Sequence, residues 1–281
     1  MIGLVRLSSL GDVVLASAVT APLGRVGFIT QPRYHSLVER FRGVQRVLGP
    51  QDKAAFERVV DLQSSPRSRV ICAGLSAPVS RVKMHRLERW TRVAFKVPQR
   101  IPLVVERYAE AAGVQLAQRP WIELERDPQR VALVPGAAHA TKRWPAEHWI
   151  ELARGLDRPW VLGGPDEAQL VERVAAEGGG EPLVERGFER TLLALSSTRV
   201  LIAGDTGLLH LAAACGVPVV GLFGPTHSAD GFWCHPGSAV ELDLPCRPCS
   251  KHGGPTCPHG DLACLSSLKP SQVLQAVAST G

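Results

Sequence analysis

The stretch I-G-L-V-R-L-S-S-L-G-D at residues 2–12 indicates the fold of this chain. The apolar run 2–7 has the composition of a buried strand, and the sequence predicts a helix from 11 to 21. The same alternation continues, because strand 25–29 precedes helix 33–42 and strands are predicted at 44–48 and 58–63. Strands that alternate with helices form a parallel sheet covered by helices. The N-terminal half is therefore predicted to be α/β.

A second alternating series follows a polar, proline-containing junction, E-R-D-P-Q-R at 125–130. Its predicted strands are 130–134, 159–163, 199–203 and 217–222, and its predicted helices are 145–154, 166–177, 189–197, 206–215 and 270–279. A chain of 281 residues is long enough for two cores. We therefore predict an α/β protein with two Rossmann-like domains, 1–126 and 127–281, and a cleft between them. The segment 64–100 is expected to consist of loops and short helices.

The composition places the chain among globular proteins, since 45% of it is hydrophobic and no run reaches the ~18 apolar residues of a membrane span. The N-terminus lacks the features of a signal peptide, so a cytoplasmic location is expected. The net charge of +6 is concentrated in a basic segment. This segment, residues 67–100, contains a single acidic residue, Glu88. Its basic residues are Arg67, Arg69, Arg81, Lys83, Arg86, Arg89, Arg92, Lys96 and Arg100. It predicts an anionic partner, with a solvated surface as the alternative, and little aromatic interleaving disfavours nucleic acid.

The first strand-to-helix loop carries the first candidate catalytic group, because ligands of parallel sheets bind beyond the carboxyl ends of the strands. Gly11 is expected to permit a tight turn there. Asp12 falls in the first helical turn, where the helix dipole stabilises a carboxylate by about 0.3–1 kcal/mol. Asp12 is therefore either a helix-stabilising charge or a general base.

The second candidate loop is G-D-T-G-L-L-H-L-A-A-A-C-G at 204–216. The free N–H groups of the helix predicted from Thr206, with Gly207, form an anion site that suits a diphosphate. Asp205 either caps this helix or contacts a ligand. His210 lies one turn into the helix and is either a ligand contact or a packing residue.

Two further loops carry polar groups that suit a nucleotide. In H-A-T-K-R-W-P at 139–145, Thr141 and Lys142 suit a phosphate, with a solvated basic loop as the alternative. In G-G-P-D-E at 163–167, Asp166 or Glu167 could accept ribose hydroxyls. The chain has no D-x-D pair, which disfavours a metal-bridged nucleotide-sugar, and no G-x-G-x-x-G after a strand, which disfavours a dehydrogenase.

Together these loops resemble glycosyltransferase family 9, the ADP-heptose:lipopolysaccharide heptosyltransferases. The resemblance is carried by R-L-S-S-L-G-D-V-V-L at 6–15, D-L-Q-S-S-P-R-S at 61–68, P-G-A at 135–137 with T-K-R-W-P at 141–145, and D-T-G-L-L-H-L-A-A-A at 205–214 with G-V-P-V-V-G-L-F-G-P-T at 216–226. It implies a GT-B fold, an N-terminal acceptor-binding domain, a C-terminal nucleotide-sugar domain, and a last helix, 270–279, that packs back on the N-terminal domain. It also implies an inverting transfer that needs no metal.

The resemblance assigns roles to individual residues. Asp12 matches the base that deprotonates the acceptor hydroxyl, and Lys142 stabilises the leaving ADP. The positions that match donor contacts are Thr141, Lys142, Glu167, Asp205, Thr206, Gly207, Leu208 and His210. The residues expected to meet a lipid A–Kdo acceptor are Ser9, Gly11, Arg67, Arg81, Lys83 and Arg86.

The implied function is transfer of heptose from ADP-heptose to a lipopolysaccharide core acceptor. The expected enzyme is a monomer with peripheral contact to the cytoplasmic face of the inner membrane and no nucleic-acid partner. The alternatives are a family 9 transferase with another nucleotide-sugar or acceptor, and an inactive relative that binds sugar nucleotides or serves as a scaffold.

Four cysteines are spaced C-x2-C-x7-C-x6-C at Cys246, Cys249, Cys257 and Cys264. In a cytosolic loop rich in glycine and proline, this spacing predicts a structural zinc site. Disulfides, free thiols and an iron–sulfur cluster are the alternatives, of which disulfides are disfavoured by the compartment. The other cysteines, Cys72, Cys215 and Cys234, are expected to be packing residues.

Overall fold

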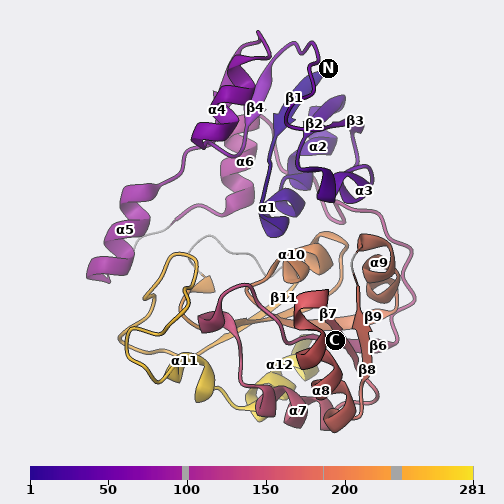
Figure 1. Cartoon of the computed structure of the whole chain (residues 1–281), viewed down its shortest axis with the longest axis vertical. Coiled ribbons are helices and arrows are strands. Elements are labelled where there is room, and N and C mark those ends of the chain that lie inside the picture. The colour runs from indigo at the N-terminus through magenta and orange to yellow at the C-terminus, as the bar shows by residue number, and fades with distance from the viewer. Residues whose placement is uncertain (97–100, 186, 229–235, 281) are drawn as a thin grey trace. The chain divides into compact units, whose positions relative to one another are not determined.

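The computed structural model describes residues 1–96, 101–185, 187–228 and 236–280 (Figure 1). The predictions made for Arg100 and Cys234 lie outside these residues. Contacts divide the chain into two compact units. Unit 1 comprises Met1–His85, Pro102–Glu123 and Ala214–Gly216, and unit 2 comprises Arg86–Ile101, Leu124–Ala213 and Val217–Gly281.

Unit 1 is built on a five-stranded parallel sheet with strand order β3-β2-β1-β4-β5. Its strands are β1 (Ile2–Val5), β2 (Val26–Ile29), β3 (Val44–Leu48), β4 (Val59–Asp61) and β5 (Val79–Arg81). Its helices are α1 (Leu10–Leu15), α2 (Ser17–Leu23), α3 (His35–Val38), α4 (Pro66–Ala73) and α6 (Val104–Ala112), with a 3-10 turn, η1, at Pro32–Tyr34. The central strands are buried on both faces, which explains their continuous apolar runs.

Three local predictions for unit 1 differ from the structure. The helix predicted from 11 to 21 is two helices that meet at Ala16. The helix predicted from 33 to 42 ends at Val38. The segment 64–85, in which no strand was predicted, contains β5, because Val79–Arg81 pairs with β4 although it offers only a short apolar signal.

Unit 2 is built on a six-stranded parallel sheet with strand order β11-β10-β9-β6-β7-β8. Its strands are β6 (Arg130–Val134), β7 (Trp160–Gly163), β8 (Glu181–Val184), β9 (Thr198–Gly204), β10 (Val219–Phe223) and β11 (Gly237–Glu241). Its helices are α5 (Arg86–Phe95), α7 (Ala146–Arg154), α8 (Ala168–Gly178), α9 (Phe188–Ser196), α10 (Gly207–Ala214), α11 (Ala263–Ser266) and α12 (Pro270–Thr280), with 3-10 turns η2 (Ala140–Lys142) and η3 (Pro165–Glu167).

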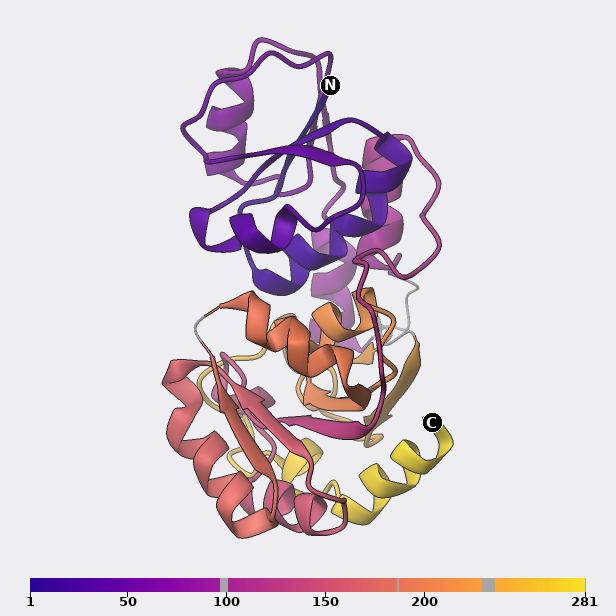
Figure 2. The same ribbon diagram turned by 90° about the vertical axis from the view of Figure 1, so that its right-hand side faces the viewer.

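The last helix, α12, packs within unit 2. It contacts α7, β10 and β11, and it is the yellow C-terminal helix of Figure 2. Its apolar face carries Val273 and Val277, which are buried in the same core cluster as Trp149. The unit 2 core accepts the buried face of α12 because that face is apolar and α7 offers a matching one. The packing of this helix on the N-terminal domain stays a prediction.

Both sheets have a switch point, where the strand order reverses and ligands of open α/β sheets bind. In unit 1 the chain runs from β1 to β2 and β3, then returns to β4 on the other side of β1. In unit 2 it runs from β6 to β7 and β8, then returns to β9 on the other side of β6. The loops after β1 and β4, and those after β6 and β9, are therefore the places for functional groups.

Candidate functional site

Asp12 lies at the switch point of unit 1, in the first turn of α1. Arg6, which follows β1 directly, places its guanidinium Nη2 at 2.5 Å from the Asp12 Oδ2. The Ser9 hydroxyl donates to the same oxygen at 2.8 Å. The other oxygen, Oδ1, has a weaker neighbour, the hydroxyl of Tyr108 at 3.4 Å. The Ser9 backbone N–H also donates to Oδ2, at 3.4 Å, so this oxygen has three donors, whereas Oδ1 is the oxygen with room for a further hydrogen bond.

Arg6 is held in place by its surroundings. It is 7% exposed, its Nη1 donates to the Leu62 carbonyl at 2.7 Å, and it lies over the Tyr108 ring. The Asp12 side chain keeps about a third of its surface, 33%. Burial opposes ionisation of Asp12, but the Arg6 charge and the Ser9 hydrogen bond outweigh it and hold the pKa of this carboxyl below its ordinary value. The structure thus presents an ionised, reachable carboxylate.

The motif D-L-Q-S-S-P at 61–66 ties β4 to the loop after β1. Asp61 is fully buried and accepts from the backbone N–H groups of Gln63 and Ser64 at 3.0 and 2.9 Å. The Ser68 hydroxyl donates to its other oxygen at 3.0 Å. The Gln63 amide oxygen accepts from the Leu7 N–H at 3.0 Å, which fixes the approach to Asp12. These residues brace the candidate base rather than offer a second one.

The residues predicted to bind an acceptor do not form one cluster within either unit. Arg67 and Ser9 are exposed in unit 1, whereas Arg86 begins α5 in unit 2. The Arg81 Nε lies 3.6 Å from the Asp61 Oδ2, and Lys83 forms an ion pair with Glu110. Their charges are therefore partly balanced.

Gly11 does not make the tight turn expected of it. It lies inside α1, is buried, and is not among the glycines with positive φ. The turn into the helix is made by the residues before it, so a small buried residue suffices at this position.

The switch point of unit 2 holds a buried ion pair. Lys142 ends η2, after β6, and Asp205 follows β9, the strand paired with β6. The Lys142 Nζ lies 2.5 Å from the Asp205 Oδ2. The side chains are 11% and 5% exposed. The sequence predicted a mobile lysine at a loop tip; its carboxylate partner instead fixes it, because a buried charge requires compensation.

His210 and Thr226 complete the surroundings of Asp205. The His210 Nε2 lies 3.8 Å from Oδ1, and the Thr226 hydroxyl donates to Oδ2 at 3.4 Å. Burial opposes the charge of Asp205, but His210 and Lys142 hold the pKa of its carboxyl below the ordinary value. The other ring nitrogen of His210, Nδ1, is buried and has no hydrogen-bond partner within the described parts of the chain. His210 therefore contacts Asp205 and retains one group for a further hydrogen bond.

Thr141 is committed to the C-terminal loop. Its hydroxyl donates to the Gly254 carbonyl at 2.9 Å and accepts from the Gly254 N–H at 2.8 Å. Beside it, a Cβ on Gly253 would lie 3.0 Å from the Lys142 Cε, and the φ of Gly253 is +85°. Glycine is thus required where this loop packs on Lys142. As its hydroxyl proton is already used, Thr141 orders the loop beside the lysine.

The other predicted donor contacts lie on neighbouring strand ends. The carboxylate of Glu167 accepts from the Gly164 N–H at 3.1 Å and packs on Gly136, where a Cβ would lie only 1.9 Å from Oε1. Glu167 thus reaches the loop after β6 from the loop after β7. Thr206, Gly207 and Leu208 are half-buried at the start of α10. Lys142, Asp205 and Glu167 therefore share the carboxyl edge of the unit 2 sheet.

The four cysteines of the predicted zinc site lie in one region of unit 2, since Cys246, Cys249 and Cys257 all act electrostatically on Cys264, and zinc binding by them stays a prediction. Within the described residues, no group of three or more His, Cys, Asp or Glu side chains is placed to hold a metal ion. Cys264 belongs to the hydrophobic core of unit 2, and burial raises the pKa of its thiol to about 11. The Cys249 thiol lies 3.8 Å from the Pro225 carbonyl. Cys72 and Cys215 are buried, as expected of packing residues.

Arg247 holds the four-cysteine loop against the chain that follows β10. It is 8% exposed and donates to the carbonyls of Gly224, Phe223 and Thr226 at 2.6, 3.2 and 2.8 Å. It also donates to the carbonyl of Leu242 and forms an ion pair with Glu241 at 2.8 Å. These contacts fix the chain on both sides of Thr226 and so support the partners of Asp205.

Four residues around the candidate site were not predicted from the sequence: Arg6, Tyr108, Thr226 and Arg247. Arg6 offered a signal, since a charged residue inside an apolar strand run requires a partner. Thr226 ends the motif G-V-P-V-V-G-L-F-G-P-T at 216–226. Tyr108 and Arg247 offered none, because their partners are distant in sequence.

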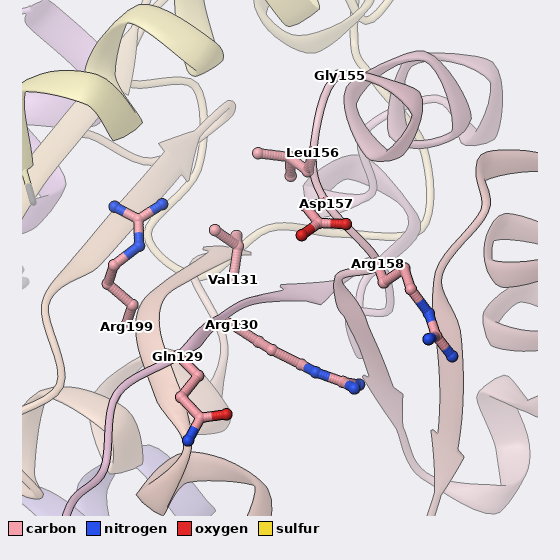
Figure 3. A pocket seen from close by; sticks show the side chains of 8 residues that line it. All are labelled: Gln129, Arg130, Val131, Gly155, Leu156, Asp157, Arg158 and Arg199. Carbon is pink, nitrogen blue, oxygen red and sulfur yellow. The ribbon is translucent and has the colours of Figure 1, made fainter.

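One pocket lies away from these groups. A cavity of about 460 Å3 in unit 2 is lined by Gln129, Arg130, Val131, Gly155, Leu156, Asp157, Arg158 and Arg199 (Figure 3). Arg130 opens β6, so the cavity lies at the amino end of that strand, whereas Lys142 follows its carboxyl end. Arg130 and Arg158 both pair with Glu181. This cavity is therefore separate from the candidate site.

Comparison with known proteins identifies the same family that the motifs of the strand-to-helix loops resemble. Residues 52–254 match the model of glycosyltransferase family 9 (heptosyltransferase). Lipopolysaccharide heptosyltransferase 1 of Pseudomonas aeruginosa is 39% identical over 125 residues, which are 41% of this chain and 35% of that protein. The chain thus aligns with only about a third of the length of this curated relative.

Solved structures match over nearly the whole chain. E. coli heptosyltransferase WaaC with ADP superposes with a TM-score of 0.71 at 18% identity and covers 100% of this chain and 99% of its own. A family 9 glycosyltransferase from Veillonella parvula superposes with a TM-score of 0.74 at 19% identity, and the match covers 99% of this chain and 96% of that one. The predicted two-domain α/β fold of GT-B type is confirmed by this likeness. The chain belongs to glycosyltransferase family 9, the heptosyltransferase family.

Proposed function

We propose that this chain transfers heptose from ADP-heptose to an acceptor of the lipopolysaccharide core. The observation that carries the proposal is the buried Lys142–Asp205 pair at the switch point of the unit 2 sheet. The E. coli relative of the same fold is described with ADP, and the curated relatives are lipopolysaccharide heptosyltransferases. A fixed cation beside the start of α10 is suited to the diphosphate of such a donor.

Unit 2 binds the donor in this proposal. The Lys142 ammonium and the first N–H groups of α10 neutralise the charge that develops on the leaving ADP, so the protein supplies charge stabilisation without a metal. Glu167 accepts hydrogen bonds from the ribose hydroxyls. Thr206, Gly207 and Leu208 line the phosphate side, and Thr141 acts indirectly by holding the loop that packs on Lys142.

Unit 1 supplies the base. The acceptor hydroxyl oxygen attacks the anomeric carbon of the sugar as the bond from that carbon to the ADP oxygen breaks. The hydroxyl proton passes to the Asp12 Oδ1, and the configuration at carbon inverts. Oδ1 suits this step because Arg6 and Ser9 occupy Oδ2.

The proposed acceptor is an anionic glycolipid of the lipid A–Kdo type. Ser9, Arg67, Arg81 and Lys83 of unit 1 and Arg86 of unit 2 would meet its phosphates and carboxylates. The enzyme would act as a monomer at the cytoplasmic face of the inner membrane. None of the described helices has the length and apolar character needed to cross a bilayer.

A donor panel tests the proposal. The intact protein is offered ADP-heptose, UDP-sugars and GDP-sugars, and thermal stabilisation and nucleotide release are measured. We expect a response to ADP-heptose. A response to UDP-sugars alone would instead identify a family 9 transferase with another donor, and binding without release would identify an inactive relative.

Asp12→Asn tests the base. We expect it to abolish transfer and leave ADP binding unchanged, because Asp12 belongs to unit 1 and the donor groups to unit 2. Asp52→Asn is the matched control, since Asp52 is an exposed unit 1 carboxylate that accepts from the Gly49 N–H. Loss of ADP binding in Asp12→Asn, or full transfer activity, would contradict the assigned role.

A further inference from the structure

The helix α5 presents an apolar face to solvent. No residue of this helix is buried, and Leu87, Trp90 and Phe95 are 69%, 49% and 64% exposed. Residues 87, 90 and 94 fall on one side of an α-helix because consecutive members are three and four positions apart, and residue 95 borders this side, eight positions after residue 87. The rings of Trp90 and Phe95 pack edge to face with centroids 5.3 Å apart. The exposed apolar side chains thus form one continuous patch.

The polar face of α5 is the one that contacts the protein. Arg89 donates to the Lys251 carbonyl at 3.3 Å, and Lys96, just after the helix, donates to the carbonyls of Cys246 and Pro248 at 2.9 and 2.6 Å. The usual arrangement of a surface helix, with its apolar side inward, is therefore reversed.

The charge of the segment indicates what covers the patch. Residues 86–96 carry four cations, Arg86, Arg89, Arg92 and Lys96, against the single anion Glu88. A basic helix with Trp, Phe and Leu on its apolar side has the composition of helices that lie in a membrane interface. Lys and Arg side chains are attracted to an anionic bilayer, and tryptophan favours the headgroup level.

We propose that the apolar face of α5, formed by Leu87, Trp90 and Phe95, docks on an anionic phospholipid bilayer. The apolar side chains enter the headgroup boundary while the cations of the helix attract lipid phosphates. This names the surface that makes the membrane contact in the proposed function and rests on it for its purpose. Docking itself needs no transferase activity, so each is tested separately.

Vesicle binding tests the proposal with the full chain. Wild-type protein is sedimented with phosphatidylcholine vesicles that contain about 30% phosphatidylglycerol, and with pure phosphatidylcholine vesicles. The double variant Leu87→Ser, Phe95→Ser is expected to bind the anionic vesicles at least about tenfold more weakly than wild type. Leu193→Ser is the matched control, because Leu193 is also 69% exposed and lies on α9 of the same unit.

Thermal stabilisation, tryptophan fluorescence and the oligomeric state separate the outcomes. ADP-induced thermal stabilisation, unchanged in the double variant, shows that unit 2 remains folded, and Trp90→Phe is expected to remove the blue shift of tryptophan fluorescence caused by vesicles. Wild-type protein that ignores anionic vesicles, or a double variant that binds them normally, overturns the proposal. A wild-type dimer that the double substitution dissociates also overturns it, because the face is then an interface between copies of the chain.

Discussion

Replacing Arg6 by Gln is expected to raise the pKa of the Asp12 carboxyl. The Nη2 to Oδ2 distance is 2.5 Å, and an opposite charge at such a distance lowers a carboxyl pKa by about 1–3 units. Because the Asp12 side chain is one-third exposed, solvent screens the pair, and we take the lower end, roughly 1 unit. One unit corresponds to about 1.4 kcal/mol. The hydrogen bonds of Asp12 with Ser9 and Tyr108 remain in the variant, so the carboxyl keeps its position.

The sign of the pH dependence follows from the direction of this pKa shift. In the wild type the folded-state pKa of Asp12 lies below its unfolded value, so its contribution to stability is present above the unfolded pKa. That contribution is lost as pH falls through the lower, folded pKa. In Arg6→Gln the folded pKa moves upward, and the contribution shrinks and is lost at a higher pH. The acid limb of kcat/KM shifts upward with it, because the base must be ionised.

The assay combines two independent measurements. Urea unfolding between about pH 3 and 8 reports stability without requiring any activity, and carboxyl NMR follows Asp12 directly. Arg6→Lys is expected to restore most of the wild-type pKa, since it restores the charge. Arg25→Gln, which removes an exposed arginine bonded to Gln45 in the same unit, is the control. An Asp12 pKa that is the same in Arg6→Gln and wild type would refute the reasoning.

Three further predictions concern unit 2. Lys142→Met removes the permanent positive charge beside the buried Asp205 carboxylate, and should cost about 3 kcal/mol in urea unfolding and weaken ADP binding in calorimetry. Arg247→Gln removes the donors that satisfy buried carbonyls and should lower stability by on the order of 3 kcal/mol, seen as a lower midpoint of thermal unfolding. Gly136→Ala should displace the flexible carboxylate of Glu167, because the added Cβ would lie 1.9 Å from its Oε1. We expect ADP binding to weaken about tenfold, whereas the unfolding free energy should change by less than about 1 kcal/mol.

The alternation of apolar strands and helices predicted both sheets because central parallel strands are buried on both faces. Val59–Asp61 and Val131–Val134 are examples. Edge strands offer less signal, which is why β5 was missed. The assignment of α5 to unit 2 was beyond the sequence, because it depends on hydrogen bonds from Arg89 and Lys96 to a loop more than a hundred residues away.

The candidate site was predictable where a local pattern carries it. Asp12, Lys142 and Asp205 follow strands that are adjacent to a switch point, so the strand pattern alone directs attention to their loops. Side-chain geometry was not predictable from the sequence. Thr141 suits a phosphate by chemistry, yet its hydroxyl is bonded to Gly254, and the cysteine spacing gives no sign that Cys264 is packed in a hydrophobic core.

Each switch point holds an ion pair, but the more exposed member is the anion in unit 1 and the cation in unit 2. In unit 1 the Arg6 side chain is 9% exposed and its partner Asp12 is 33% exposed, whereas in unit 2 the Asp205 side chain is 5% exposed and its partner Lys142 is 11% exposed. In each pair the more exposed member is the one proposed to meet substrate, an anionic base in unit 1 and a cation for the diphosphate in unit 2. The deeper member supplies the opposite charge that makes burial tolerable and fixes the position of the working group. Removal of Arg6 or Asp205 should therefore affect the working group through its pKa or its position, whereas removal of Asp12 or Lys142 should eliminate the chemistry itself.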